Sequence, residues 1–388
     1  MTTTTNKEQK KLNVPNLRFS EFQGEWEEHL LGNISDVTKL AGFEFTKYVT
    51  YEDTGSIIAI RGLNCKNGSL DLRDVKYIDN SDFSKLSRSK LYVGDILYTY
   101  VGTVGEVAVV DKNDKYYLAP NVSRIRLSKD YNSDFIKQLL GSKKFYNKIV
   151  FPLIATSSQP ALSMENLRRF KLRVPSIKEQ KKIASLFNAI DERIATQNKI
   201  IEKLQSLIKG LRVRLIQIES GNIVHLGEIA QIYQPQTISS TELTEDGFLV
   251  YGANGIIGKY KEYNHKTEQI CITCRGNTCG MVNYTKPMSW ITGNAMVINT
   301  DEHPNKVCKR YLYHYLSAYN FNSIISGSGQ PQIVRTPLEK LEITLPSIFE
   351  QEQKVMLLDR IQAKIEISNR VLSLYQGQKQ YLLRQMFI

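Results

Sequence analysis

The spacing of hydrophobic residues changes along the chain and predicts two kinds of element. From Phe19 to about Val174, apolar and polar residues alternate in short runs that are broken by Gly, Asn and Asp. The clearest runs are Ile57–Ile60, Asp95–Tyr100 and Val104–Val110. Alternation of this kind predicts short β-strands. From about Lys178 to Glu219 the apolar residues recur every three or four positions, which predicts one long amphipathic helix.

The same succession of patterns occurs twice, with framework residues separated by a constant offset of 330 − 159 = 171 residues. The repeated residues are Gln159-Pro160, Leu167, Pro175-Ser176-Ile177, Glu179-Gln180, Leu186, Ile190 and Ile194, which return as Gln330-Pro331, Leu338, Pro346-Ser347-Ile348, Glu350-Gln351, Leu357, Ile361 and Ile365. A period of this length is too long for a solenoid. It indicates a tandem duplication of a unit that consists of a globular module and a helix.

Each long helix has a start signal. Ser176 follows Pro175 and precedes Glu179 by three residues, which is the pattern of a capping box. Ser347 and Glu350 repeat that pattern in the second copy. A shorter helix is expected from Ser133 to Ile149, where the apolar residues fall on one face.

The two long helices must bury their apolar stripes, and the simplest way is to pack against each other. A duplicated unit pairs most naturally about a pseudo-twofold axis, so the helices are expected to run antiparallel. Forty residues give a rod of roughly 60 Å, with one module expected at each end. The alternative is that each helix packs on its own module. The predicted fold class is α+β, with two tandem mixed modules separated by two long helices in an antiparallel coiled coil.

The predicted domain boundaries follow from these patterns. Residues 1–15 are polar and expected to be disordered, 16–175 form the first module and 176–219 the central helix. Residues 220–346 form the second module, and 347–388 form the C-terminal helix.

Composition points to a binding protein with a polyanionic partner. The formal charge of +12 favours such a partner, because each phosphate contact releases condensed counterions. A moderately basic soluble protein is the alternative explanation. The chain has no long apolar stretch and no signal-peptide core at its start, so a cytoplasmic location is expected. Five cysteines, an odd number, are expected to be reduced thiols.

Catalytic signatures are missing from the sequence. It contains no phosphate-binding loop, no dinucleotide-binding loop, no nucleophile elbow and no Asn/Asp-Pro-Pro-Tyr motif. The spacing of Cys271, Cys274 and Cys279 does not match a zinc site. We therefore expect no metal, no catalytic residue and a role in binding and scaffolding.

Each module has two loops that are rich in Gly, Ser and Thr and carry side chains that could read base edges. The first loop covers residues 100–103 in the first module and 274–278 in the second, and the second loop covers residues 155–160 and 326–332. Arg pairs with guanine in the major groove, and Asn or Gln pairs with adenine. The alternative is that these loops are tight turns with exposed polar residues. The candidate DNA-binding residues are Arg61, Tyr100, Thr103, Ser157, Ser158, Gln159, Asn254, Arg275, Asn277, Thr278, Ser328, Gln330, Gln332 and Arg335.

Taken together, the segments Trp26–Val37, Asp95–Gly105 and Gln159–Gln180, with their counterparts Leu226–Ile232, Gln269–Gly280 and Gln330–Gln351, resemble the specificity subunit of type I restriction–modification enzymes. The resemblance covers nearly the whole chain through the order of module, helix, module and helix. It implies two target-recognition domains, each of which reads one half of a split, asymmetric site in double-stranded DNA.

The resemblance also implies partners. Two methyltransferase subunits are expected to dock on the helices, and restriction subunits join these. S-adenosylmethionine, Mg and ATP are expected on those partner subunits and not on this chain. The residues expected at the subunit interface are Ile190, Ile194, Leu204, Ile361, Ile365 and Leu372. A coiled-coil adaptor that joins two protein partners is the main alternative function.

Overall fold

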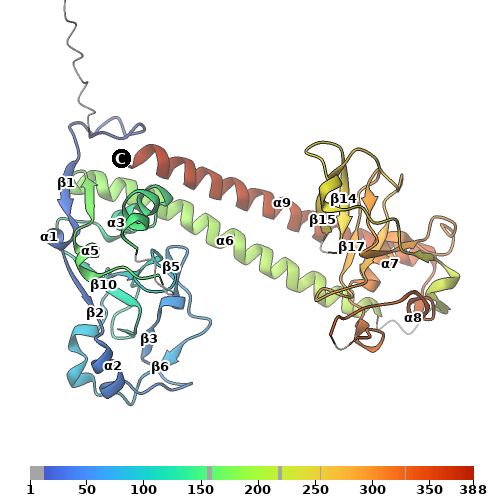
Figure 1. Cartoon of the computed structure of the whole chain (residues 1–388), viewed down its shortest axis with the longest axis horizontal. Helices are drawn as coiled ribbons and strands as arrows, with labels where there is room; N and C mark the ends of the chain where they lie inside the picture. The colour runs from blue at the N-terminus through green and yellow to red at the C-terminus, as the bar shows by residue number, and fades with distance from the viewer. Residues whose placement is uncertain (1–12, 155–159, 217–220, 254, 328) are drawn as a thin grey trace, which may run out of the picture. The chain divides into compact units, whose positions relative to one another are not determined.

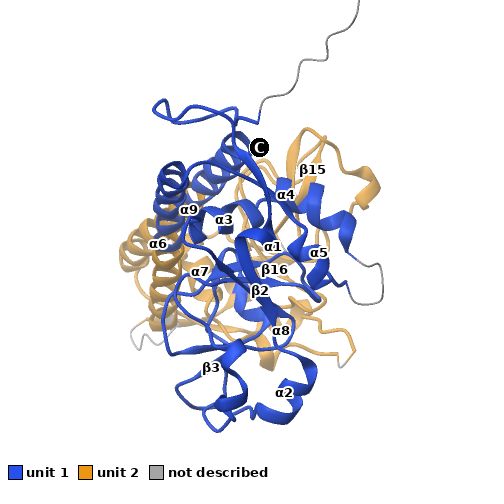
Figure 2. Cartoon of the chain, turned by 90° about the vertical axis from the view of Figure 1, so that its left-hand side faces the viewer, with its two compact units in different colours: residues 1–196, 372–388 blue, residues 197–371 orange. Residues whose placement is uncertain are grey.

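The computed structural model describes residues 13–154, 160–216, 221–253, 255–327 and 329–388. The chain divides into two compact units (Figure 2). Unit 1 comprises residues 1–196 and 372–388, and unit 2 comprises residues 197–371. Each unit therefore contains one module, one half of the central helix and one part of the C-terminal helix.

Unit 1 is built on a four-stranded antiparallel sheet with the order β2-β10-β7-β8. The strands are β2 (Ser35–Lys39), β7 (Ile96–Thr99), β8 (Val107–Val109) and β10 (Val122–Leu127). Strand β7 is buried on both faces: Ile96 and Tyr98 belong to one hydrophobic cluster and Leu97 to another. This position explains why its sequence is almost continuously apolar.

Smaller sheets complete unit 1. One contains β3 (Ile58–Ile60) between β6 (Lys76–Tyr77) and β9 (Tyr116–Leu118), with β3 and β9 parallel. A hairpin joins β4 (Cys65–Lys66) to β5 (Ser69–Leu70), and β1 (Glu27–Leu30) pairs with β11 (Lys171–Val174). The short helices are α1 (Leu31–Ile34), α2 (Gly42–Tyr48) and α5 (Met164–Arg168), which Figure 1 labels.

The single helix predicted over Ser133–Ile149 is broken. Helix α3 (Ser133–Leu140) ends at Gly141, and α4 (Lys143–Phe145) begins after Ser142 and continues as a π-helix over Tyr146–Val150. The Ser142 hydroxyl accepts a hydrogen bond from the Phe145 backbone N–H at 3.2 Å, so Ser142 caps a new helix.

Unit 2 repeats this plan. Its main sheet has the order β13-β19-β16-β17, which matches the order in unit 1. The strands are β13 (Gln231–Tyr233), β16 (Ile270–Thr273), β17 (Val282–Tyr284) and β19 (Ala295–Asn299). A second sheet has β14 (Phe248–Gly252) between β15 (Gly255–Tyr260) and β18 (Trp290–Ile291), and β12 (Asn222–His225) pairs with β20 (Glu342–Leu345). Helices α7 (Lys309–Leu316) and α8 (Arg335–Glu339) correspond to α3 and α5.

A repeated glutamine links each long helix to its module. The Gln180 amide donates to the Pro175 carbonyl at 2.8 Å and accepts from the Asn132 N–H at 2.9 Å. Gln351 donates to the Pro346 carbonyl at 2.9 Å and accepts from the Cys308 N–H at 2.8 Å. Both glutamines are buried, so they satisfy backbone groups that would otherwise have no partner.

A repeated glycine allows close packing at the start of each module. A Cβ atom on Gly32 would lie 3.0 Å from the Arg168 Cβ, and one on Gly227 would lie 3.1 Å from the Glu339 Cβ. The close approach of α5 to Gly32, and of α8 to Gly227, therefore explains why a glycine follows the leucine in both copies.

The two long helices are α6 (Ile177–Ile216) and α9 (Ile348–Met386). In unit 1, Lys379 pairs with Asp191 at 2.6 Å, and the Arg193 guanidinium lies 5.9 Å from the centre of the Tyr375 ring. In unit 2, the Gln197 amide donates to the Ser368 carbonyl. As the residue numbers on α6 increase, the numbers of the contacting residues on α9 decrease. This order confirms the predicted antiparallel pairing. No described helix is both long and apolar enough to cross a membrane.

The helices pack on the modules as well as on each other. In unit 1, Ile183 and Phe187 of α6 join the core cluster, as do Leu383 and Phe387 at the end of α9. The Phe387 ring lies 6.3 Å from the Trp26 ring and 5.2 Å from the Phe135 ring. In unit 2, residues of α6 and α9 contribute to the core in the same way. The apolar stripes of the long helices are therefore buried in both of the ways considered, against each other and against the modules.

The helix starts agree with the predicted capping box in only one copy. Glu350 accepts from the Ser347 backbone N–H at 3.0 Å, as the pattern predicts. Glu179 instead accepts two hydrogen bonds at 2.8 Å from the Arg18 guanidinium. The difference arises because Arg18, in the segment that precedes β1, pairs with Glu179.

Candidate nucleic-acid interface

In each unit, the structure joins the two loops that the sequence singles out. In unit 1 the Gly102 N–H donates to the Pro160 carbonyl at 2.9 Å, and the Leu162 N–H donates to the Tyr100 carbonyl at 2.8 Å. In unit 2 the Gly276 N–H donates to the Pro331 carbonyl at 2.9 Å, and the Ile333 N–H donates to the Cys274 carbonyl at 3.0 Å. The loops thus form one composite surface in each unit.

The central glycine of each first loop adopts a left-handed conformation. Gly102 has φ +77° and Gly276 has φ +84°, and a Cβ at either position would meet no atom within 4 Å. The requirement is therefore in the backbone and not in the available space. An open turn of this kind leaves the main chain accessible to an approaching ligand.

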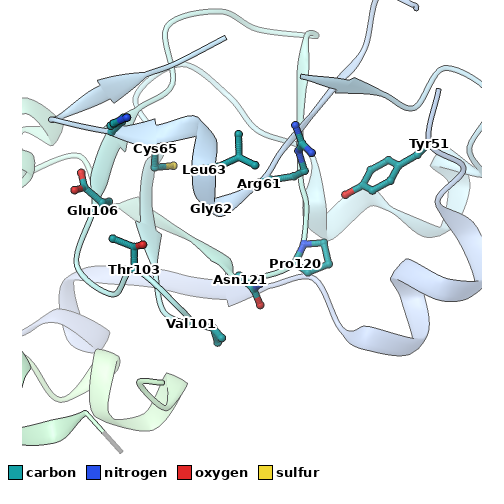
Figure 3. A pocket seen from close by; sticks show the side chains of 11 residues that line it. Tyr51, Arg61, Gly62, Leu63, Cys65, Val101, Thr103, Glu106, Pro120 and Asn121 are labelled. Carbon is teal, nitrogen blue, oxygen red and sulfur yellow. The ribbon is translucent and has the colours of Figure 1, made fainter. Parts of the chain in front are cut away.

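In unit 1 the first loop borders a cavity of about 530 Å³ (Figure 3). Figure 3 shows Arg61 and Tyr51 on one side of the cavity and Thr103 and Glu106 on the other, with Asn121 below them. The cavity is formed by the chain after β3, by the Gly102 loop and by the turn before β10. It brings Arg61 and Thr103, two of the predicted residues, to the same site.

Arg61 is held in a fixed position. Its Nη2 donates to the Asp74 carboxylate at 2.8 Å and to the Asp74 carbonyl at 3.0 Å. Its Nε atom is buried and has no hydrogen-bond partner among the residues that the structure describes. Asn64 fixes the same loop by donating to the carbonyls of Asp71 and Asp74. Arg61 is therefore preorganised and retains donor capacity.

Three further residues of the cavity were missed by the sequence analysis. Lys66 lies on the β4–β5 hairpin, whose turn residues Asn67 and Gly68 have positive φ. The Glu106 carboxylate accepts from the Asn67 N–H at 2.9 Å and so fixes the hairpin beside the cavity. Asn121, with φ +71°, accepts a hydrogen bond from the Tyr100 N–H through its carbonyl. The Asn-Gly pair is a known turn signal and could have identified this hairpin.

Burial governs the ionisation of two groups that line the cavity. It raises the pKa of the Cys65 thiol to about 12, and the nearby Glu106 charge acts in the same direction. Burial also raises the pKa of the Tyr51 hydroxyl. Both groups are therefore neutral near pH 7, so Cys65 does not present a thiolate nucleophile.

Tyr100 contributes to the site in another way than predicted from its loop position. Its side chain is only 9% exposed and belongs to the core cluster of unit 1. The Lys39 ammonium lies 5.2 Å from the centre of its ring. Tyr100 therefore supports the loop from below, and a direct contact between Tyr100 and DNA stays a prediction.

In unit 2 the predicted residues that the structure describes lie on the two joined loops, apart from Arg335, which begins α8. Arg275 and Gln332 form a β-bridge, so the first loop is tied to the second at these residues. Both residues are exposed, as are Asn277, Gln330 and Arg335. Arg335 is held by Glu339, which accepts from its Nε at 2.6 Å. Thr278 is half-buried in the same loop.

Five predicted residues lie outside the described residues: Ser157, Ser158, Gln159, Asn254 and Ser328. The cysteines of unit 2 are divided between two clusters, with Cys271 in one and Cys274 in the other. Burial raises the pKa of the Cys271 thiol to about 12. No group of three or more potential metal ligands occurs in the described parts of the chain.

The predicted subunit-interface residues lie on the two long helices. Ile190 and Ile365 are buried, and Ile194, Leu204, Ile361 and Leu372 are half-buried. Ile365 and Ile361 pack with Ile208 in the core of unit 2. Other apolar residues of the helices face solvent, including Leu207, Leu357 and Leu374.

The fold and the joined loops define a duplicated protein that presents two loop surfaces with a similar framework and different side chains. Residues 23–206 and 219–374 match the family described as the type I restriction modification DNA specificity domain. Because the two matches cover most of the chain, it belongs to this family.

Individual relatives agree with this assignment. The chain is 23% identical over 410 residues to the putative type I restriction enzyme MjaX specificity subunit of Methanocaldococcus jannaschii, covering 93% of this chain and 92% of the relative. It is 32% identical over 140 residues to the type I restriction enzyme EcoprrI specificity subunit of Escherichia coli, covering 35% of this chain and 34% of the relative.

A solved structure has the same fold. The S subunit of a type I restriction–modification system from M. genitalium superposes with a TM-score of 0.70 at 17% identity, covering 97% of this chain and 99% of that chain.

Proposed function

We propose that this chain is the DNA-reading subunit of a type I restriction–modification complex, with one half of a split, asymmetric site read by each unit. The observation that carries the proposal is the pair of joined loops in each unit. Framework residues of the loops repeat between the units, whereas the exposed side chains differ. Two different half-sites are the expected consequence, because identical frameworks then present different hydrogen-bonding groups.

The loop chemistry suits the reading of base edges. In unit 1, Arg61 and Thr103 face one cavity, with Asn121 between them. In unit 2, Arg275 and Asn277 project from the first loop and Gln330 and Gln332 from the second. Arginine can donate to guanine and the amides can pair with adenine, at about 1–3 kcal/mol of discrimination for each bidentate pair.

We further propose that the long helices dock methyltransferase subunits and that these recruit restriction subunits. A solved structure that concerns complex assembly of the type I restriction–modification system superposes on this chain with a TM-score of 0.52 at 16% identity. Solvent-facing Leu207, Leu357 and Leu374 provide apolar contact surface on the helices. S-adenosylmethionine, Mg and ATP then belong to the partner subunits, and this chain supplies no catalytic group.

The first test is methylome sequencing of cells that carry this chain with its methyltransferase partner, compared with cells that lack the chain. The expected result is a methylated split motif that disappears without the chain. An unchanged methylome, with the partner shown to be active, would reject the proposal and favour a protein adaptor.

A second test assigns the half-sites to the units. Arg61→Ala with Thr103→Ala is expected to relax only one half of the motif, and Arg275→Ala with Asn277→Ala only the other. Relaxation of both halves by either pair would contradict one reader per unit.

A further inference from the structure

Unit 1 has a strongly basic surface beside its reading loops. Two adjoining cavities of about 310 Å³ and 380 Å³ share Ser142 and Lys144 as lining residues. We call the surface they form the basic groove; its cationic residues are Lys143, Lys144, Lys148, Lys171, Arg173 and Arg384. Residues from α4, β11 and the end of α9 thus converge on one site.

The cations of the basic groove outnumber its carboxylate side chains. Glu28 is the only acidic side chain that lines either cavity within the described residues, and it pairs with Lys171 at 3.2 Å and with Arg173 at 3.4 Å. Lys144 donates to the Phe387 carbonyl. Lys143, Lys148 and Arg384 are exposed and form no ion pair with any residue that the structure describes. Uncompensated charge of this kind favours an anionic ligand.

Unit 2 lacks this charge at the corresponding places. The segment that follows α7, Ser317–Ile325, contains no Lys or Arg, whereas the segment that follows α3 contains three lysines. By the 171-residue repeat, Lys171, Arg173 and Arg384 correspond to Glu342, Thr344 and Val213. A cavity of about 450 Å³ does occur there, with Ser317, Ala318 and Val213 among its lining residues. The cavity is thus duplicated, but two cations, Lys209 and Arg212, line it in unit 2, whereas six line the basic groove of unit 1.

The helical segment that lines the basic groove also contacts a reading loop of unit 1. Tyr146, three residues after Lys143, packs against Gly105. A Cβ atom on Gly105 would lie only 2.8 Å from Cδ2 of the Tyr146 ring. Gly105 closes the first reading loop by donating its N–H to the Thr99 carbonyl. The helical segment that carries Lys143 and Lys148 therefore packs against the first reading loop.

We propose that the basic groove binds backbone phosphates of the DNA duplex that flanks the half-site read by unit 1. This inference rests on the function proposed above and adds a footprint that is more extensive on unit 1, because the corresponding cavity of unit 2 has fewer cations. The lysines act as point charges that need no base sequence, so the groove adds affinity without changing the motif.

The composition of the groove favours phosphate over an acidic protein. Of the apolar residues that line it, Leu139, Phe145, Leu383 and Phe387 are buried, and Ile149 and Ile388 are half-buried. Asn147 and Gln380 are exposed and lie among its cations. No large apolar side chain that lines the groove is fully exposed, whereas the centre of a protein interface is enriched in aromatic and apolar contacts.

The test measures the salt dependence of binding between the complex, with its methyltransferase partner, and a duplex that carries the methylated motif. The variant is Lys143→Gln with Lys148→Gln and Arg384→Gln, three exposed positions whose loss leaves the core intact. The slope of log K against log salt is expected to become shallower by about 2–3, since each lost phosphate contact accounts for about 0.9. The methylated motif is expected to remain the same.

A charge-matched control separates local contacts from net charge. Lys199→Gln with Lys203→Gln and Lys364→Gln removes the same charge from exposed positions of the long helices. This control is expected to change the slope by less than 1. Equal changes in the two triple variants would show a bulk charge effect and overturn the proposal.

Shortened duplexes locate the contact. Removal of the base pairs that flank the unit 1 half-site is expected to abolish the difference between wild type and the groove variant, whereas removal of the other flank leaves it. An unchanged slope with weakened methyltransferase binding would show that an acidic protein surface occupies the groove, and would overturn the proposal. Absence of any methylated motif would instead reject the proposed function itself.

Discussion

The two units share their backbone framework but differ in the side chains that join the short helix of each module to the long helices. In unit 1, Gln138 of α3 donates to Asp191 of α6 at 2.8 Å. In unit 2, His314 holds the same sixth position of α7 and contacts Asp359 at 2.9 Å. Asp359 also pairs with Arg310. Positions that satisfy backbone groups, such as Gln180 and Gln351, are retained in both units, whereas charge pairs between side chains have been replaced.

The partners of His314 define its tautomer. The Arg212 Nε–H can only donate, so Nδ1 of His314 accepts this bond at 3.1 Å, and Nε2–H donates to Asp359. A second proton on Nδ1 would face Arg212. Burial, followed by the nearby arginines, lowers the pKa of His314 to about 4, although Asp359 acts in the opposite direction. Unit 2 therefore contains a neutral histidine where unit 1 contains an amide.

The largest expected effect is a loss of stability in unit 1 alone, because the end of the chain contributes to the core of unit 1. Phe387→Ala removes a ring that is 2% exposed from the core of unit 1. Loss of a buried Phe costs about 3–5 kcal/mol, so unit 1 is expected to unfold at lower denaturant. The chain has two tryptophans, Trp26 in unit 1 and Trp290 in unit 2, so single-tryptophan variants report each unit by fluorescence.

Leu374→Ala on the same helix is the control for Phe387→Ala. Leu374 is 67% exposed, so its loss is expected to cost less than about 0.5 kcal/mol. Equal shifts of the Trp26 and Trp290 transitions in Phe387→Ala would contradict the division of the chain into two cores.

The next effect is a pH dependence confined to unit 2. The folded-state pKa of His314 lies below its ordinary value, so the unfolded chain binds the proton first. The contribution of neutral His314 is complete above pH 6.5 and is lost as the pH falls from about 6.5 to about 4, up to about 3 kcal/mol. Denaturant unfolding followed by Trp290 across this range measures it.

His314→Gln gives unit 2 the residue of unit 1 and is expected to flatten this dependence. Burial also lowers the pKa of His265 in unit 2, so a smaller dependence should remain. An unchanged pH profile in His314→Gln would show that another group carries the effect.

The repeated glutamines provide a smaller and symmetrical effect. Gln180→Leu and Gln351→Leu each leave a buried carbonyl and a buried N–H without partners. Each variant is expected to lose about 2 kcal/mol of stability. The loss should appear only in the transition of Trp26 for Gln180→Leu and only in that of Trp290 for Gln351→Leu. A loss of stability in the opposite unit would contradict the view that each glutamine stabilises its own module.

The smallest expected effect concerns the glycines of the first reading loops. Gly102→Ala and Gly276→Ala place a side chain at positive φ in open space, at a cost of about 1 kcal/mol. Thermal unfolding of both variants should show similar small shifts, and each is expected to weaken methylation through one half-site only. Gly105→Ala should be worse than either, because its Cβ would also meet the Tyr146 ring.

Features that arise from local periodicity or from the repeat could be predicted from the sequence. The long helices, their antiparallel pairing and the Ser347–Glu350 capping box are of this kind. Residues 100–103 and 274–278 were identified as reading loops because Gly and polar side chains follow a predicted strand. The break at Gly141–Ser142 was missed because apolar residues continue with helical spacing across it.

Contacts between distant segments could not be predicted in this way. The pairing of Arg18 with Glu179 and the cavity shared by Arg61 and Thr103 depend on tertiary folding. Tyr100 was selected for its loop position, but strand alternation places its side chain in the core. Loop residues alone do not show which of them reach a common surface.

The placement of Phe387 in the core of unit 1 has a consequence for synthesis on the ribosome. Unit 2 is one continuous segment, residues 197–371, and is fully translated before residues 372–388 emerge. Unit 1 cannot complete its core until Leu383, Met386 and Phe387 have been made, although its module is synthesised first. Domains commonly fold in the order of their synthesis. Here the N-terminal unit finishes last, and a nascent chain stalled before residue 383 would carry an incomplete first unit beside a finished second one.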